Sequence, residues 1–394
     1  MKHSQLRIIA MLAAVSLVVI LLAACAPAAT PAPAATPQIV EVTREVKVEV
    51  TKQVEVVKEV VKEVTKEVQV EVTAVPADLW SPAEVTAASG AQLCSPVTAL
   101  PKQFKKPWTV GYINLDKSHP FFSQWEAGMQ AAATAYGVKY IGMDAANGAS
   151  IDQLDPLLAQ KPDLVGSQKD MDAIASRLLK LNIPYLNIDE GQTEYSPYTY
   201  GVPNATAGRL AGEKLVEGLK KKMAADWKGR ELFFLEFTHG GVPACVTRTG
   251  ASAKAVQEGM GLDDAHVLKQ DPFTVGTTPP DMILATLTAH PKAVFGLIPC
   301  WDALGVEPYN TAKEGGREDD ILMVTMGADK PTVDFLKTKP KGYYAVMEFS
   351  PWCEGWSWVE TSLAILEGVP FKPYTVDKFI TQDTVDARYA ELYP

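Results

Sequence analysis

The amino-acid sequence predicts an α/β fold with two lobes, each built around a parallel sheet, and a cleft between them. Strand and helix patterns alternate from Pro107 to the end of the chain, which is typical of parallel sheets with crossover helices. A set of five strands occurs twice in succession, which indicates two lobes. The chain of 394 residues is long enough for both lobes and for a leading segment of different composition.

The first residues, 1–24, are predicted to be a targeting signal rather than part of the fold. Basic residues precede an apolar stretch, residues 8–22, which is too short and too soon followed by proline for a good membrane span. The stretch runs into Leu-Ala-Ala-Cys, which resembles the lipobox of bacterial lipoproteins. The resemblance implies cleavage before Cys25 and acylation of this residue, and several acyl chains would anchor it stably. A plain signal peptide cut nearby is the alternative.

Residues 25–106 are predicted to form a lipid-anchored linker and stalk. A proline/alanine linker is followed by Val/Glu/Lys repeats in residues 40–72 and by a connector that contains Pro, Ala and Ser. Valines at intervals of three or four indicate a coiled-coil seam, whereas alternating pieces favour strands and valine is a mediocre helix former. We expect a charged stalk that holds the folded part away from the membrane, and self-association of this stalk is left open. A partly disordered spacer is the alternative.

The folded part begins with the stretch 108–122, which is predicted to be a buried strand, a polar loop and a pair of aromatic residues that opens a helix ending at Gly137. Further elements of the first lobe are strands at 138–145, 163–168, 185–190 and 198–202 and helices at 150–160 and 171–181. A long helix after Asn204 leads to the second set. Its elements are strands at 231–237, 266–270, 293–299, 321–327 and 343–349 and helices at 248–261 and from Pro280, Asp302 and Pro331. A tail follows, with a helix at 351–368 and a last strand at 375–380.

Charge, cysteines and motifs exclude several classes of function. The net charge of −10 argues against a nucleic-acid binder, which usually has a basic surface. The histidines show no metal spacing, and there is no GxSxG elbow or Walker loop. Four cysteines besides Cys25 allow three pairings, and their wide spacing favours disulfides over zinc. Paired carboxylates could in principle serve glycoside hydrolysis, but the two-lobed layout favours binding, so we expect no enzyme.

Short motifs near the predicted strand ends carry a resemblance. They are His-Pro-Phe-Phe from residue 119, Asn-Ile-Asp-Glu from 187, the crossing segment from 202, the loop around Arg248, and IPCWDALG and MGADK in the second set. Together they resemble the type I periplasmic binding proteins, the ribose- and galactose-binding receptors of sugar importers. The resemblance implies two Rossmann-like lobes joined by a hinge, formed by residues 107–202 plus 349–372 and by residues 203–348 plus 373–394.

The resemblance also implies a set of ligand-binding residues. In the family, phenylalanine rings sandwich the sugar, and here His119 replaces the family's Asn. Glu190 stands where ribose binders carry Arg, Trp301 where the family has Asn, and Glu348 where sugar binders often have Gln. The implied set is His119, Phe121, Phe122, Asp189, Glu190, Arg248, Trp301, Asp302, Asp329 and Glu348. The alternatives are caps or turns for Asp189 and Asp302, a surface ion pair for Arg248, core packing for the aromatic residues and a hinge role for Glu348.

The expected function is that of an extracytoplasmic solute-binding lipoprotein of an ABC importer. The ligand would be a monosaccharide or related polyol. The other expected partners are a permease and, through the lipid anchor, the membrane. No cofactor, metal or nucleic acid is expected. A cationic or amino-bearing ligand and a ligand-sensing role for a signalling partner are alternatives. In this fold the first strand commonly lies beside the third, which would bring Cys245 and Cys300 together and leave Cys94 and Cys353 as the other pair.

Overall fold

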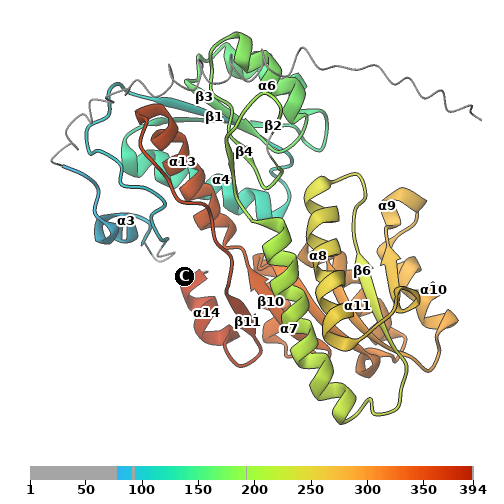
Figure 1. The fold of residues 1–394 in the computed structure, drawn as a ribbon. Helices are drawn as coiled ribbons and strands as arrows, with labels where there is room; N and C mark the ends of the chain where they lie inside the picture. The colour runs from blue at the N-terminus through green and yellow to red at the C-terminus, as the bar shows by residue number, and fades with distance from the viewer. Residues whose placement is uncertain (1–77, 91–93, 192, 393–394) are drawn as a thin grey trace, which may run out of the picture. The chain divides into compact units, whose positions relative to one another are not determined.

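The computed structural model describes residues 78–90, 94–191 and 193–392, so the predicted signal, Cys25 and the stalk repeats lie outside the described residues. The first lobe holds a parallel sheet in the order β2-β1-β3 and a parallel pair β4-β5 (Figure 1). A bridge between Val165 and Tyr185 links β3 to the chain that enters β4. The strands are β1 (Thr109–Asn114), β2 (Lys139–Asp144), β3 (Leu164–Ser167), β4 (Asn187–Ile188) and β5 (Thr199–Tyr200).

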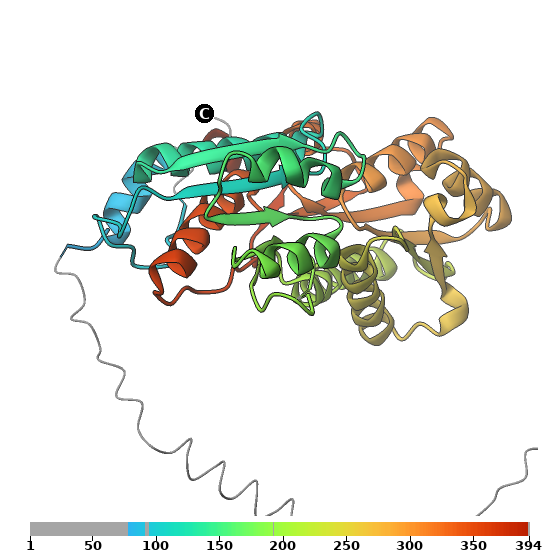
Figure 2. The ribbon, with the colours of Figure 1, turned by 90° about the horizontal axis from the view of Figure 1, so that it is seen from above.

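Helices cover the sheet of the first lobe (Figure 2). They are α4 (Pro120–Tyr136), η3 (Ser150–Gln153), α5 (Leu154–Leu158), α6 (Met171–Lys180) and α13 (Pro351–Glu367). Helix α4 begins where His119 caps it and Pro120 fixes its first turn, and it ends at Gly137 in the left-handed conformation. Its start therefore lies directly after β1, at the end of the sheet where loops are free to contact a ligand.

The second lobe is built on a six-stranded sheet in the order β11-β10-β9-β8-β6-β7. Five strands are parallel, and β11 pairs with β10 in the antiparallel direction at one edge. The strands are β6 (Leu232–Phe237), β7 (Val267–Gln270), β8 (Val294–Pro299), β9 (Ile321–Gly327), β10 (Tyr343–Glu348) and β11 (Phe379–Thr381). Strands β6, β8 and β9 are buried along their whole length, which is why their sequences are continuous apolar runs.

Seven α-helices accompany this sheet in the described residues. They are α7 (Asn204–Ala224), α8 (Pro243–Met260), α9 (Pro272–Val275), α10 (Pro279–Ala289), α11 (Asp302–Glu314), α12 (Lys330–Lys337) and α14 (Val385–Leu392), with the short turns η4 (Asp264–His266) and η5 (Glu318–Asp320). Helix α8 begins five residues earlier than expected because Pro243 starts its first turn. Helices α9 and α14 were not expected from the sequence.

The chain crosses between the lobes three times in the described residues. It passes from β5 to α7 near Val202, from β10 to α13 near Ser350, and from α13 to β11 through residues 369–378. Helix α13 packs against α4 of the first lobe, whereas β11 belongs to the sheet of the second lobe. The two lobes are therefore joined at three places in the described part of the chain.

The expected linker boundary at residue 106 is wrong, because the described part of residues 78–106 packs on the first lobe. Helix α3 (Pro82–Ala88) has a capping box made by Ser81 and Glu84. Val85, Cys94, Val97 and Leu100 belong to the buried core of the first lobe. The disulfide Cys94–Cys353 fastens this segment to α13. The fold therefore begins at least 29 residues earlier than Pro107 (residue 107 minus residue 78).

Helices α4 and α13 approach each other closely at two glycines. A Cβ atom on Gly128 would lie 1.9 Å from the carbonyl oxygen of Trp352, and one on Gly355 would lie 2.0 Å from that of Trp125. Real atoms do not come this near, so an added methyl group would force the helix backbones apart. The two glycines thus set the distance between the helices.

We expect Gly355→Ala to lower the free energy of unfolding by about 1–3 kcal/mol, the cost of overpacking a core. The measurement is urea unfolding of the chain. Gly250→Ala is the matched control, because Gly250 lies in the exposed face of α8 with open space around it. That change should raise stability by up to ~1 kcal/mol through helix propensity. Equal effects of the two changes would contradict the close contact.

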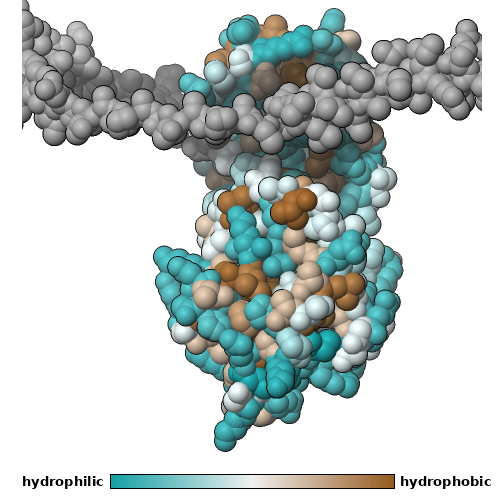
Figure 3. Space-filling model, turned by 90° about the vertical axis from the view of Figure 1, so that its right-hand side faces the viewer, coloured by the Kyte–Doolittle hydropathy of each residue, from teal (hydrophilic) through white to brown (hydrophobic). Residues whose placement is uncertain are grey.

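On the side of the second lobe that carries α9 and α10, apolar patches are scattered among polar surface (Figure 3). The exposed large apolar side chains of these two helices are Phe273, Val275 and Leu284. No helix in the described residues is long and apolar enough to span a bilayer.

Candidate functional site

A cavity of about 750 Å³ lies where the two lobes meet, and loops from both lobes line it. The loops follow β1, β2, β3 and β4 in the first lobe and β6, β7, β8 and β9 in the second, so all of them leave the carboxyl ends of strands. Nine of the ten predicted residues line the cavity: His119, Phe121, Phe122, Asp189, Glu190, Arg248, Trp301, Asp302 and Asp329. The structure thus brings together residues that are more than two hundred positions apart in the chain.

The tenth predicted residue, Glu348, lies outside the cavity wall. Its carboxylate accepts hydrogen bonds from Ser350 and from the guanidinium of Arg388 on α14, with Nε to Oε2 at 2.7 Å. Only 5% of Glu348 is exposed, and the ion pair occupies its carboxylate next to the crossing from β10 to α13. The ligand role expected from the sequence is therefore replaced by a structural role beside the hinge.

The aromatic side of the first lobe is positioned by the start of α4. Nδ1 of His119 accepts a hydrogen bond from the backbone N–H of Phe121 at 3.2 Å, which caps the helix. The Phe121 and Phe122 rings are perpendicular with centroids 5.7 Å apart, and Phe122 stacks on the buried Trp125 at 5.9 Å. Burial lowers the pKa of His119, while Asp329 and Asp116 oppose this effect. His119 is therefore a neutral ring beside the phenylalanines at pH 7.

The second lobe faces the cavity with an aromatic group that the sequence analysis missed. The rings of His239 and Phe273 are stacked at 4.2 Å with an angle of 11°, and Phe273 lies 5.7 Å from Trp301. All three residues line the cavity, and 45% of Phe273 is exposed. Phe273 lies in the four-residue helix α9, which Asp271 caps by accepting from the backbone N–H of Thr274. The Asp-Pro pair before Phe273, directly after β7, was the signal available in the sequence.

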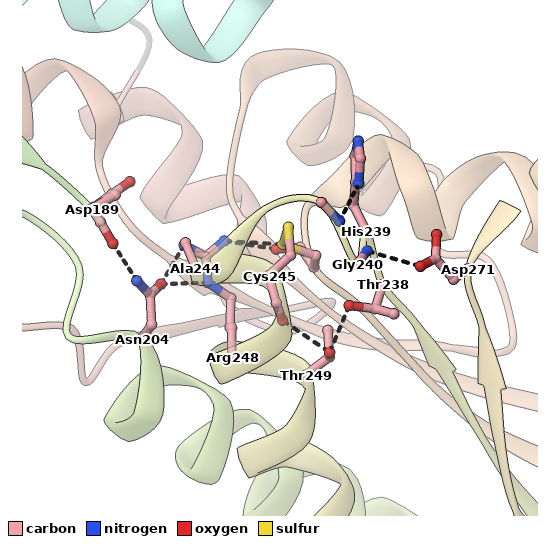
Figure 4. The surroundings of a disulfide bond; sticks show 12 residues. Asp189, Asn204, Thr238, His239, Gly240, Ala244, Cys245, Arg248, Thr249 and Asp271 are labelled. Atoms are coloured by element: carbon pink, nitrogen blue, oxygen red, sulfur yellow. Dashed lines mark hydrogen bonds between the residues drawn. A yellow bond between two sulfur atoms is a disulfide. The ribbon is translucent and has the colours of Figure 1, made fainter. Parts of the chain in front are cut away.

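Arg248 lines the cavity close to the first crossing between the lobes, where Figure 4 shows it beside Asn204. It is 6% exposed, and its Nη1 donates to the carbonyl oxygen of Cys300 at 2.7 Å. Its Nε and Nη2 both donate to Oδ1 of Asn204, at 2.9 and 2.6 Å. The disulfide Cys245–Cys300 that the sequence favoured joins the first turn of α8 to the β8–α11 loop beside Arg248. The surface ion pair considered for Arg248 is thus not what the structure contains.

Buried carboxyl groups surround Arg248. Burial raises the pKa of Asp189, which the charge of Arg248 partly offsets, and burial raises the pKa of Glu190 to about 7. Burial and the neighbouring Asp329 raise the pKa of Asp302. Glu354 on α13 is fully buried behind the cavity wall, and burial together with Asp189 raises its pKa. The cavity therefore carries less negative charge near neutral pH than its number of acidic residues suggests.

Several of these carboxylates also have structural partners. Asp329 caps α12 by accepting from the backbone N–H of Thr332 at 2.9 Å, and Oδ2 of Asp302 accepts from the N–H of Asp329 at 3.1 Å. Oδ1 of Asp189 accepts from the N–H of Val202 at 2.6 Å. Asp189 and Asp302 thus accept from backbone N–H groups in turns, as their alternative interpretation expected, whereas the helix cap is made by Asp329. All three still line the cavity. Among the described residues, no group of three or more His, Cys, Asp or Glu is placed to hold a metal ion.

Solved structures share this two-lobed arrangement. A solute-binding protein from Bacillus halodurans C-125 with bound myo-inositol has a TM-score of 0.60 and 14% identity, with 72% of this chain and 98% of that chain covered. A solute-binding protein from Actinobacillus succinogenes 130z with bound D-allose has a TM-score of 0.60 and 16% identity, with 72% of this chain and 100% of that chain covered. A solute-binding protein from Agrobacterium radiobacter in complex with D-arabinose has a TM-score of 0.60 and 17% identity, with 73% of this chain and 98% of that chain covered. At these identities the likeness concerns the fold.

A comparison with curated proteins finds no match. The family model described as "Periplasmic binding protein domain" matches residues 110–369, which span most of both lobes. The members are binding proteins, in agreement with the expectation that this chain is not an enzyme. The match, the two α/β lobes and the three crossings lead to one conclusion: the chain belongs to the periplasmic binding proteins and has their type I fold.

Proposed function

We propose that this protein is an extracytoplasmic, lipid-anchored solute-binding protein of an ABC importer, and that it binds a monosaccharide or related polyol. The observation that carries the proposal is the cavity between the lobes, where aromatic rings from both lobes stand beside buried carboxyl groups and an arginine. A sugar has apolar C–H faces and a rim of hydroxyl groups. Aromatic rings cover the first, and carboxyl, amide and guanidinium groups bind the second.

The electrostatics of the cavity favour a neutral ligand over a cation. A carboxyl group with a raised pKa spends part of its time protonated near neutral pH, and then it can both donate and accept hydrogen bonds. Glu190, with a pKa of about 7, is in this range, and the pKa of Asp302 is also raised. Hydroxyl groups also donate and accept, so they match such carboxyl groups better than an ammonium group does.

A cationic or amino-bearing ligand is the second candidate. Asp170, Asp189, Glu190, Asp302 and Asp329 line the cavity, against two basic residues, Lys169 and Arg248. If most of these carboxyl groups are ionised when the ligand binds, an ammonium group would be attracted to them. The same ligand screen separates the two candidates.

The location and the transport role rest on other grounds. The lipobox-like sequence that ends at Cys25 supports a membrane anchor. The similar structures include ABC transporter solute-binding proteins with bound myo-inositol and D-allose and a carbohydrate transporter solute-binding protein in complex with D-arabinose. In use, the open form would meet the ligand, the lobes would close over it, and a permease would bind the closed form. The ligand favours closure only through its better contacts in the closed form. A ligand-sensing role for a signalling partner would use the same closure.

We expect a thermal-shift screen of residues 75–394 against pentoses, hexoses, inositols, amino sugars and amino acids to give hits among the neutral sugars. A ligand at 100 times its Kd adds about 2.7 kcal/mol of stability, enough to raise the melting temperature by a few degrees. Phe122→Ala should weaken the best hit by about tenfold or more, since it removes an aromatic face.

Phe335→Ala is the matched control for this screen, because Phe335 is partly buried on α12 outside the cavity wall. It should lower the melting temperature and leave the shift caused by ligand intact. Hits confined to amines or amino acids would keep the fold and overturn the sugar assignment.

A further inference from the structure

Arg248 is a buried cation whose direct hydrogen-bond partners among the described residues are neutral. It donates to the amide oxygen of Asn204 and the backbone oxygen of Cys300, with a longer contact of 3.9 Å to the Cys300 sulfur. The carboxyl groups of Asp189 and Glu354 act on its charge through space. A buried arginine more often pairs directly with a carboxylate, and such a pair would cancel its charge locally.

Asn204 makes an unusual set of contacts for a residue at the start of a helix. Asparagine in this region commonly caps its own helix, but here Pro203 is the capping residue of α7 and Asn204 follows it. Oδ1 of Asn204 accepts both Nε and Nη2 of Arg248, and its Nδ2 donates to the carbonyl oxygen of Asp189. Figure 4 shows Asn204 between these two partners. Its side chain is therefore used for tertiary contacts.

The contacts of Asn204 fix the orientation of the guanidinium. Arginine has five N–H donors in one plane, and three of those of Arg248 point to Asn204 Oδ1 and the Cys300 carbonyl. The two remaining N–H groups have no oxygen or nitrogen acceptor among the described residues, although Nη1 also lies 3.9 Å from the Cys300 sulfur. Since Arg248 lines the cavity, a ligand there can accept from them. Because the side-chain amide of Asn204 carries no charge, it does not neutralise the positive charge of Arg248, which can therefore attract a ligand.

The same side chain connects the two lobes. Asn204 is the first residue of α7, at the first crossing, while Asp189 belongs to the first lobe and Arg248 to the second. We propose that Asn204 is a positioning residue of the ligand site, which holds the guanidinium of Arg248 toward the cavity and ties it to the Asp189 loop across the hinge. This inference rests on the proposed binding function of the cavity.

One experiment needs no ligand. In NMR spectra of the Arg Nε–H groups, the signal of Arg248, assigned by its loss in Arg248→Lys, should exchange slowly with water. Asn204→Ala should speed that exchange at least tenfold. Asn204→Asp keeps an acceptor oxygen and should retain slow exchange. Asn310→Ala, at a half-buried position of α11 outside the cavity wall, is the control and should leave the signal unchanged. Slow exchange in Asn204→Ala would overturn the inference.

The second experiment is a double-mutant cycle with whichever of D-arabinose, D-allose and myo-inositol gives the largest thermal shift. We expect Asn204→Ala and Arg248→Lys each to weaken binding about tenfold, and the double variant to be no weaker than Arg248→Lys by more than about twofold. The inference would be overturned if the loss of affinity in the double variant equalled the product of the losses in the two single variants. It would also be overturned if Asn204→Ala bound as well as wild type. Failure of the three probes to bind wild type would count against the proposed sugar ligand, and the exchange measurement would still decide the role of Asn204.

Discussion

Replacing both Cys94 and Cys353 with alanine should lower the free energy of unfolding by about 2–5 kcal/mol, the range typical for a native disulfide. The bond joins residues 259 positions apart, so it removes a large amount of conformational freedom from the unfolded chain. It also fastens the segment that contains α3 to α13, beside the core contacts of Val97 and Leu100 and the hydrogen bond from the Val97 N–H to Glu360. Urea unfolding under oxidising conditions measures the effect.

The second disulfide is the matched comparison. Cys245–Cys300 spans 55 positions, so the chain-entropy term of its removal is smaller by about 1.4 kcal/mol. Its removal should also weaken ligand binding, because the disulfide fixes the loop in which the carbonyl oxygen of Cys300 accepts from Arg248. We therefore expect loss of stability alone from the Cys94/Cys353 change, and loss of both stability and affinity from the Cys245/Cys300 change. Equal loss of affinity in the two variants would contradict this assignment.

The two lobes could be predicted from the sequence because buried parallel strands leave a clear pattern. Strands β6 and β9 are buried at every position, and their runs of apolar residues are unmistakable. The segment 78–106 has no such run. Its burial rests on separate residues such as Val85, Val97 and Leu100 and on a disulfide, so its Pro- and Ala-containing sequence resembles a linker.

Most of the candidate site could be predicted because ligand residues of this architecture follow the ends of strands. Nine of ten predicted residues do so and line the cavity. Glu348 is the last residue of β10, but its surroundings depend on Arg388 in α14, a helix that the sequence analysis did not expect. Phe273 was missed because a helix of four residues has no periodicity to detect.

The contacts of Asn204 lie beyond any pattern in the sequence. Asn204 and Arg248 are 44 positions apart, and both belong to helices whose patterns show only which face is buried. The direction of a polar side chain at a helix start depends on what the neighbouring lobe offers. Such pairings need the three-dimensional arrangement of the crossings.

Glu190 links the lobes in a way that should make stability depend on pH. Its Oε2 accepts from the backbone N–H of Ala244 in the first turn of α8, a helix whose own N-cap, Val242, supplies no side-chain bond. The Glu190 carboxyl group of the first lobe thus accepts a hydrogen bond from the first turn of α8, a helix of the second lobe. Burial raises its pKa to about 7; the N–H of Ala244 and the charge of Arg248 oppose the rise, and Asp189 adds to it.

The direction of the pH effect follows from the two pKa values of Glu190. The pKa is 4.5 without the fold and about 7 within it, so the folded protein binds the proton more tightly. The stability that Glu190 contributes is complete below pH 4.5 and is lost as the pH rises through 7. The difference between the two values (7 minus 4.5) corresponds to ~3 kcal/mol. Glutamine carries no charge at any pH and keeps an oxygen that accepts from Ala244.

We therefore expect Glu190→Gln to be more stable than wild type by ~3 kcal/mol at about pH 8, with a gap that shrinks toward zero as the pH falls to about 4.5. Urea unfolding at a series of pH values measures the gap between the two proteins, which isolates Glu190 from the other titrating groups. Glu258→Gln is the control, because Glu258 lies on α8, the helix that Glu190 contacts, in an exposed ion pair with Lys254 at 3.9 Å. That change should alter stability by less than ~0.5 kcal/mol. A gap for Glu190→Gln that stays constant over the whole range would mean that the folded lobes do not hold Glu190 in the buried contact with α8.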